Sequence, residues 1–171
     1  FMGTGGIISD TGPLRPQYSR AEIAALIDET HRHDNPVATH AYGGEGAIVA
    51  IEEGVDTIEH ATRFGETELE LVEGGDQFLV ATSAVYFHER GIEAEARGDE
   101  TLMEALEEVR GDFEASWRQI LDADVNVAVG TDSLRGAMPF EIEKLIEFGA
   151  TPQEAIAAAT IDAARCARCA E

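Results

Sequence analysis

Three polar side chains of the sequence fall at the carboxyl ends of short apolar segments that read as strands. His40 and His60 each end such a segment, and Asp132 follows a third one. Because the carboxyl ends of parallel strands carry the functional site in α/β folds, we expect these side chains to meet at one rim. Two imidazoles and a carboxylate form the ligand set of a hydrolytic metal site. One histidine at a strand end is commonly structural, but three ligand-type residues at equivalent positions predict a metal centre.

The elements that position these residues alternate between strands and helices. Short apolar runs predict strands, and apolar residues at helical spacing predict helices. The sequence predicts strands over 37–40, 55–60, 78–82 and 126–130, and helices over 19–34, 43–53, 67–73, 99–123, 140–148 and 151–167. This alternation indicates an α/β fold with a parallel sheet covered by helices.

Two parallel architectures fit the alternation of elements. A doubly wound open sheet suits 171 residues, whereas a (β/α)8 barrel needs about 250 residues and eight strand–helix units. Four strands are clear, and residues 1–6 read as the end of a further strand. Residues 86–98 are polar and are expected to form a loop, and Gly111 is a candidate break in its helix. Length alone favours the open sheet.

The amino-acid sequences of several segments add information that the chain length does not. These segments are THAYG at 39–43, AIEEGVDTIEH at 50–60, GTD at 130–132 and GATPQEAIAAAT at 149–160. Together they resemble the metal-dependent amidohydrolase superfamily, in particular the branch with imidazolonepropionase-like and prolidase-like enzymes. The resemblance covers nearly the whole chain and is weakest between residues 86 and 125. It implies a (β/α)8 barrel in place of the open sheet.

The resemblance also assigns roles to individual residues. It implies that His40, His60 and Asp132 are the metal ligands of the fifth, sixth and eighth barrel strands. The family's other ligands, a His-x-His pair on the first strand and a carboxylated lysine on the fourth, have no match. The segment 31–33 has the letters His-Arg-His, but it falls at a predicted helix end and is interpreted as structural. We therefore expect residues 1–171 to be a partial TIM barrel, the C-terminal part with strands five to eight.

The chemistry implied by this resemblance is hydrolysis of C–N bonds. One or two divalent metal ions, expected to be zinc, would activate a water molecule, with Asp132 as the general base and acid. Tyr42, two residues after His40, is expected to bind the substrate, although an aromatic residue with its hydroxyl in water is an equal alternative. The substrate class is a small amide, dipeptide or cyclic amide. Half of a barrel is expected to be inactive alone, and to need its missing N-terminal half or self-association.

A second hypothesis comes from a different class of protein. The chain would then be a non-catalytic, degenerate parallel α/β domain that completes its sheet by self-association. Stoichiometric zinc bound through His40 and His60 favours the enzyme lineage, whereas the absence of metal binding at high zinc favours the degenerate domain.

Composition limits the partners and the surroundings of the protein. The chain has 34 acidic and 12 basic side chains and a formal net charge of −22, which argues against nucleic acid and anionic membranes as partners. Lys144 is the only lysine, which indicates adaptation to concentrated salt, with an ordinary acidic protein as the alternative. Two cysteines, Cys166 and Cys169, cannot form a disulfide framework, so a cytoplasmic location is expected.

Overall fold

The strands of the sheet run parallel and follow one another in space in the order of the sequence. This computed structural model describes residues 1–169. Its strands are β1 (Ala38–Ala41), β2 (Thr57–His60), β3 (Phe78–Ala81) and β4 (Asn126–Val129). A doubly wound sheet reverses its strand order at a switch point, whereas a barrel wall does not. The unbroken order β1-β2-β3-β4 is therefore that of a barrel wall, and the expectation of an open doubly wound sheet from chain length is wrong.

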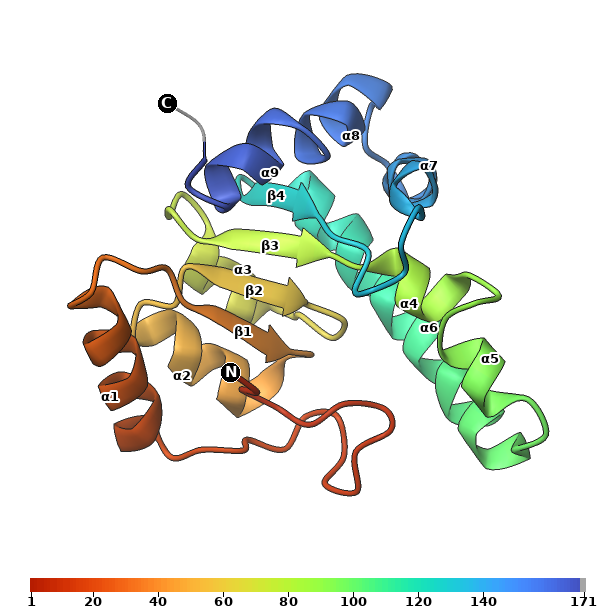
Figure 1. Ribbon diagram of the computed structural model, residues 1–171, viewed down its shortest axis with the longest axis horizontal. Helices are drawn as coiled ribbons and strands as arrows, with labels where there is room; N and C mark the ends of the chain where they lie inside the picture. Colours follow the sequence, from red (N-terminus) through yellow and green to blue (C-terminus); the bar gives the residue numbers. More distant parts are fainter. Residues whose placement is uncertain (170–171) are drawn as a thin grey trace.

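Nine helices pack around this sheet among residues 1–169, and several of them cover one of its faces. They are α1 (Arg20–His31), α2 (Gly44–Glu52), α3 (Glu66–Val72), α4 (Ser83–Phe87), α5 (Ile92–Ala96), α6 (Glu100–Asp122), α7 (Met138–Phe148), α8 (Pro152–Ala158) and α9 (Ile161–Cys166). Figure 1 looks onto the other face, with α2, α3 and α6 behind the strands. None of the helices described is both long and apolar enough to cross a lipid bilayer.

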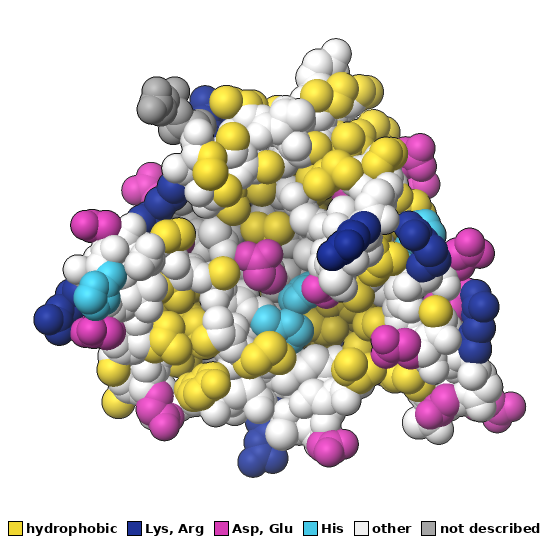
Figure 2. All heavy atoms as spheres, in the orientation of Figure 1, with side chains coloured by type: hydrophobic (Ala, Val, Ile, Leu, Met, Phe, Trp, Pro, Cys, Tyr) yellow, Lys and Arg dark blue, Asp and Glu magenta, His cyan; other side chains and the backbone are white. Residues whose placement is uncertain are grey.

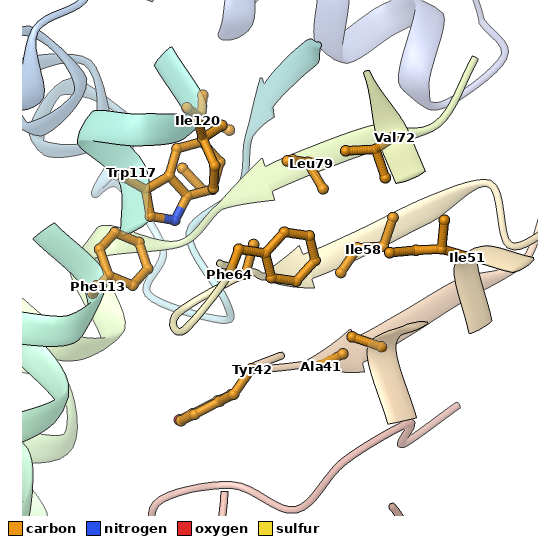
Figure 3. Packing of buried hydrophobic residues seen from close by; sticks show 14 of the residues in the cluster. Ala41, Tyr42, Ile51, Ile58, Phe64, Val72, Leu79, Phe113, Trp117 and Ile120 are labelled. Carbon is orange, nitrogen blue, oxygen red and sulfur yellow. The ribbon is translucent and has the colours of Figure 1, made fainter. Parts of the chain in front are cut away.

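The helix-covered face holds the hydrophobic core. Ile58 and Leu79 point from the sheet into this layer and are completely buried, as are Phe113 and Trp117 from α6. Figure 3 shows these side chains between the strands and α6. Each large apolar side chain removed from water contributes about 1.5–3 kcal/mol. The apolar stripe of α6 therefore anchors this long helix firmly across the sheet.

Two expectations about secondary structure need correction. Residues 86–98 form no continuous loop, because α4 extends into the segment and α5 follows, with Ile92 and Ala96 buried beneath α6. The helix expected over 151–167 is two helices, α8 and α9, interrupted at Thr160, whose ψ angle of −91° is not helical. The segment 1–6, expected as the end of a further strand, does pair with β1 in parallel, through a bridge between Met2 and His40.

Candidate metal centre

The side chains of His40 and His60 meet at the carboxyl ends of the first two strands. Their ring centroids are 4.5 Å apart and the ring planes are inclined by 70°, in an edge-to-face arrangement. His60 is nearly buried, with 6% of its surface exposed, whereas His40 is half-buried on the open face. Figure 2 shows histidine and acidic side chains together in the middle of this open face. The structure therefore brings two of the three predicted ligands together.

His40 is held by a carbonyl group from the N-terminal segment. Its Nε2 atom lies 3.1 Å from the backbone oxygen of Gly5. A carbonyl oxygen only accepts hydrogen bonds, so Nε2 carries the proton and the lone pair of the neutral ring is on Nδ1. Burial lowers the pKa of His40, while the Gly5 carbonyl and the charge of Asp132 oppose this shift.

His60 is held by the neighbouring strand. Its Nδ1 atom lies 2.6 Å from the hydroxyl oxygen of Thr82, which directly follows β3. When Nδ1–H donates to this hydroxyl, the lone pair of the ring is on Nε2. Burial, and secondarily the proximity of His40, lower the pKa of His60 to about 3. Both histidines are thus held as neutral rings with one fixed nitrogen and one free nitrogen, as metal-binding histidines are.

Two tyrosines enclose the histidine pair. The Tyr42 ring centroid lies 5.3 Å from that of His40 and 5.9 Å from that of His60, and Tyr86 packs 6.1 Å from His60. Tyr42 and Tyr86 are only 2% and 1% exposed. Burial raises the pKa of both phenols, so both stay protonated and can donate a hydrogen bond. The alternative for Tyr42, a rim aromatic with its hydroxyl in water, does not agree with this burial.

Asp132 lies apart from the two histidines. It is exposed in the turn between β4 and α7, where it and Ser133 have positive φ angles of 41° and 68°. Its negative charge still reaches the site, since it opposes the lowering of the His40 pKa. Within residues 1–169, no three His, Cys, Asp or Glu side chains converge closely enough to hold a metal ion. The two imidazoles therefore fit a divalent metal, but the three-residue set is not assembled.

Comparison with known proteins identifies the lineage of this arrangement. Residues 3–170 match the model of the amidohydrolase family. The chain belongs to the amidohydrolase family. This membership confirms the resemblance carried by the segments around His40, His60 and Asp132, and it places the chain in a lineage of hydrolases.

The relatives of this amidohydrolase chain are considerably longer than the chain itself. Ochratoxinase from Aspergillus niger is 30% identical over 168 residues, which are 95% of this chain and 34% of ochratoxinase. A Xaa-Pro dipeptidase with bound methionine in its active site is 27% identical and superposes with a TM-score of 0.87, covering 98% of this chain and 43% of the dipeptidase.

A prolidase complexed with N-methylphosphonate-L-proline is 29% identical and superposes with a TM-score of 0.85, covering 99% of this chain and 42% of the prolidase. The chain therefore spans less than half the length of these relatives. The similarity confirms a partial barrel of the prolidase-like branch.

Two further polar residues of the amidohydrolase chain, His31 and Glu59, have structural partners. His31 lies at the end of α1, where its Nε2 is 2.8 Å from a carboxylate oxygen of Asp56, so its structural interpretation holds. Glu59 is paired in register with His40 and so shares its face of the sheet, where burial raises its pKa and Thr57 donates to it at 2.7 Å.

Sequence reasoning did not identify the residues that orient the histidines. Gly5 and Thr82 are distant from them in the chain, by 35 and 22 residues, and neither belongs to a motif. The polar composition of residues 86–98 predicts a loop for Tyr86, whereas Tyr86 lies in α4. Its position shortly after a strand is the one signal that could have placed it at the rim.

Proposed function

We propose that this chain supplies part of the active site of a metal-dependent hydrolase that cleaves the C–N bond of an amide or peptide. The proposal depends on one observation, the contact between His40 and His60. Two neutral imidazoles, each with one nitrogen engaged by the protein, occupy the carboxyl ends of neighbouring parallel strands. That is the position of the site in barrel enzymes.

The proposed ligands are His40 through Nδ1, His60 through Nε2 and, as in the family, Asp132. A divalent ion at this position, expected to be zinc, would lower the pKa of a water molecule toward neutrality. The exposed carboxylate of Asp132 would take up the proton of this water and return it to the leaving nitrogen. Tyr42, whose raised pKa keeps its hydroxyl protonated, would donate a hydrogen bond to a carbonyl or carboxylate group of the substrate.

We further propose that residues 1–171 form the C-terminal part of a longer barrel. The relatives are more than twice as long, and the open face of the sheet leaves Glu59 and His40 half-buried, whereas a closed barrel would enclose them. Among the described strands β4 pairs only with β3, and we propose that its other edge pairs with the N-terminal half or, in a homo-oligomer, with a second copy of the chain. A small amide or dipeptide, as the names of the relatives imply, is the proposed substrate.

Metal titration of the purified chain tests the assignment of the ligands. Zinc is expected to bind, and the variants His40→Ala, His60→Ala and Asp132→Ala are each expected to bind it more weakly. His33→Ala is the matched control, because His33 is exposed beyond α1 and pairs only with Glu29. Equal zinc affinity in the wild type and in all three ligand variants would contradict the proposal.

Activity measurements test the proposed half-barrel separately. The chain alone is expected to leave a proline-containing dipeptide intact, because further ligands are assigned to the other half. Hydrolysis at ordinary enzyme rates by a monomer of this chain would show that the half-barrel proposal is wrong.

A further inference from the structure

The turn after β2 has a backbone conformation that is unfavourable for most residues. His60 and Ala61 have φ angles of 80° and 46°, in the left-handed region. Outside glycine, this region brings Cβ too close to a backbone oxygen. Such residues persist only where the surrounding structure holds them. Two of them in succession, one being a proposed metal ligand, therefore require neighbours that fix the turn.

The conformation of this turn changes where His60 points. Strand register pairs His40 with Glu59 and Ala41 with His60. Regular alternation would therefore place Glu59 on the face of His40 and His60 on the opposite, helix-covered face. The His60 ring instead lies 4.5 Å from the His40 ring. The left-handed turn thus accounts for a contact between the two histidines that a regular strand would not allow.

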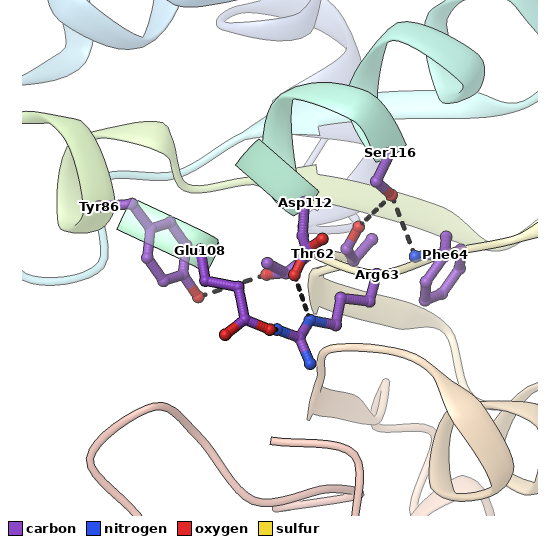
Figure 4. Close-up of polar contacts among 8 residues, drawn as sticks. Thr62, Arg63, Phe64, Tyr86, Glu108, Asp112 and Ser116 are labelled. Atoms are coloured by element: carbon purple, nitrogen blue, oxygen red, sulfur yellow. Dashed lines mark hydrogen bonds and ion pairs between the residues drawn. The ribbon is translucent and has the colours of Figure 1, made fainter. Parts of the chain in front are cut away.

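Helix α6 holds the carbonyl groups of both unusual residues. The indole Nε1 of Trp117 donates to the carbonyl oxygen of His60 at 2.8 Å. The hydroxyl of Ser116 donates to the carbonyl oxygen of Ala61 at 2.7 Å and accepts from the backbone N–H of Phe64 at 3.0 Å. Both helix residues are buried, so water does not compete for these bonds. Figure 4 shows Ser116 bridging the two ends of the turn.

Further contacts next to those of Ser116 and Trp117 restrict the conformation of the turn after β2. One turn earlier on α6, Asp112 accepts from Nε of Arg63 at 2.5 Å. On the other side, the backbone N–H of Ala61 donates to Ala41 at 3.1 Å, and that of Arg63 donates to Tyr42 at 2.6 Å. The turn is therefore fixed between β1 and α6, and within residues 1–169 only α6 contacts the carbonyl groups of the two left-handed residues through side chains.

We infer that Ser116 and Trp117 are positioning residues for the metal site, since their hydrogen bonds hold the left-handed turn that directs His60 toward His40. The expected effect of these residues on metal affinity rests on the proposed function. The orientation that they give to His60 does not. The contact between the two histidine rings exists in the metal-free protein, so it gives a readout that does not depend on a metal.

Two variants remove the hydrogen bonds with little change of shape. Trp117→Phe removes the indole donor and keeps an aromatic ring, and Ser116→Ala removes the hydroxyl. Each is expected to weaken Co²⁺ binding about tenfold or more, the range seen when outer partners of metal ligands are lost. Val109→Ala is the matched control, because Val109 is a buried residue of α6 that packs without bonding the turn. It should lower the unfolding temperature but leave Co²⁺ affinity unchanged.

A second substitution distinguishes positioning from general stability. Glycine adopts the left-handed region freely, so Ala61→Gly removes part of the need for Ser116. The double variant Ala61→Gly, Ser116→Ala should recover most of the Co²⁺ affinity lost in Ser116→Ala. The inference would be overturned if Val109→Ala lowered Co²⁺ affinity as much as Ser116→Ala does. It would also be overturned if adding Ala61→Gly to Ser116→Ala did not restore Co²⁺ affinity.

Nuclear Overhauser contacts between the His40 and His60 rings in metal-free protein complete the test. They should be strong in the wild type and in Val109→Ala, and weakened in Ser116→Ala and Trp117→Phe. A wild type that binds no Co²⁺ would reject the proposed function, and the ring contacts would then decide the positioning role alone. Unchanged ring contacts in both variants would overturn that role.

Discussion

The hydroxyl oxygen of Thr82 lies 2.6 Å from Nδ1 of His60, and this contact joins β2 and β3 at the rim of the sheet. It decides which nitrogen of His60 faces the site, because the engaged nitrogen is not available to a metal ion. Gly5 does the same for His40 from the opposite side, through its carbonyl oxygen. The two histidines are therefore preorganised by different elements of the chain.

Replacing Thr82 with valine should weaken metal binding with little effect on the fold. Valine has nearly the same shape, and the Thr82 side chain makes no capping bond to α4. Loss of the hydroxyl frees Nδ1 of His60, and we expect zinc affinity to fall about 10- to 100-fold. Competition with a chromophoric chelator measures this change.

The control for that experiment is Thr39→Val. Thr39 is also buried in the sheet, on β1, and among residues 1–169 its hydroxyl makes only 3.4 Å contacts with backbone oxygens. It should bind zinc as the wild type does. If Thr82→Val also binds zinc as tightly as the wild type, Thr82 does not orient His60.

The strand-end rule located His40 and His60 from the sequence because strand ends have a clear local signal. Apolar runs and the residue that ends them are visible without any knowledge of distant contacts. The left-handed φ angle of His60 has no such signal, since alanine follows it where a glycine would have marked the turn. Sequence reasoning could thus predict that the two histidines share a rim, but not how their rings are turned.

The segment 86–98 shows a second limit of sequence reasoning. Its polar composition indicated a loop, yet α5 forms because α6 buries Ile92 and Ala96. The two residues that α6 buries are too few to form a periodic pattern, and their burial depends on a helix that starts later in the chain. Tertiary packing therefore overrides local composition at this position.

Glu141 should make the stability of the protein depend on pH near neutrality. This completely buried residue of α7 accepts hydrogen bonds from the backbone N–H groups of Ser83 and Ala84, both at 2.7 Å. Burial raises its pKa to about 7, although these bonds oppose the shift. The folded state holds the proton more tightly than the unfolded state. The stabilisation is therefore complete below about pH 4.5 and is lost as pH rises through about 7.

The variant Glu141→Gln cannot ionise and isolates this contribution. As pH rises from 4.5 to 8, the unfolding free energy of the wild type should fall relative to that of Glu141→Gln by on the order of 3 kcal/mol. Urea denaturation at several pH values measures it. Glu143→Gln, an exposed change on the same helix, controls for the loss of one charge. A difference that is constant with pH would show that Glu141 does not titrate in this range.

Two glycines should respond in opposite ways to replacement by alanine. Gly43 has a φ angle of 148°, and an added Cβ would lie 2.4 Å from the backbone oxygen of Arg63. Gly43→Ala should therefore displace the turn after β2 and cost about 2 kcal/mol or more. Gly111 lies inside the unbroken helix α6, where an added Cβ meets nothing within 4 Å.

Gly111→Ala should accordingly stabilise the protein by about 0.5–1 kcal/mol, because alanine loses less backbone freedom in a helix. Chemical denaturation of both variants measures the two effects. Destabilisation by Gly111→Ala would mean that α6 is interrupted at this position, and a neutral Gly43→Ala would mean that the turn at Arg63 can move freely.

The strongly acidic composition should make the fold more stable in concentrated salt. With a net charge of −22 on 171 residues, the acidic side chains repel one another. Raising KCl from 0.1 M to 1 M shortens the Debye length from about 10 Å to about 3 Å and so screens this repulsion. The unfolding temperature should therefore rise across this range. The triple variant Glu73→Lys, Glu104→Lys, Glu143→Lys changes three exposed residues without an ion-pair partner among those described. Because it carries less net charge, its unfolding temperature should depend less steeply on KCl, and an equal slope would show that self-repulsion does not limit the fold.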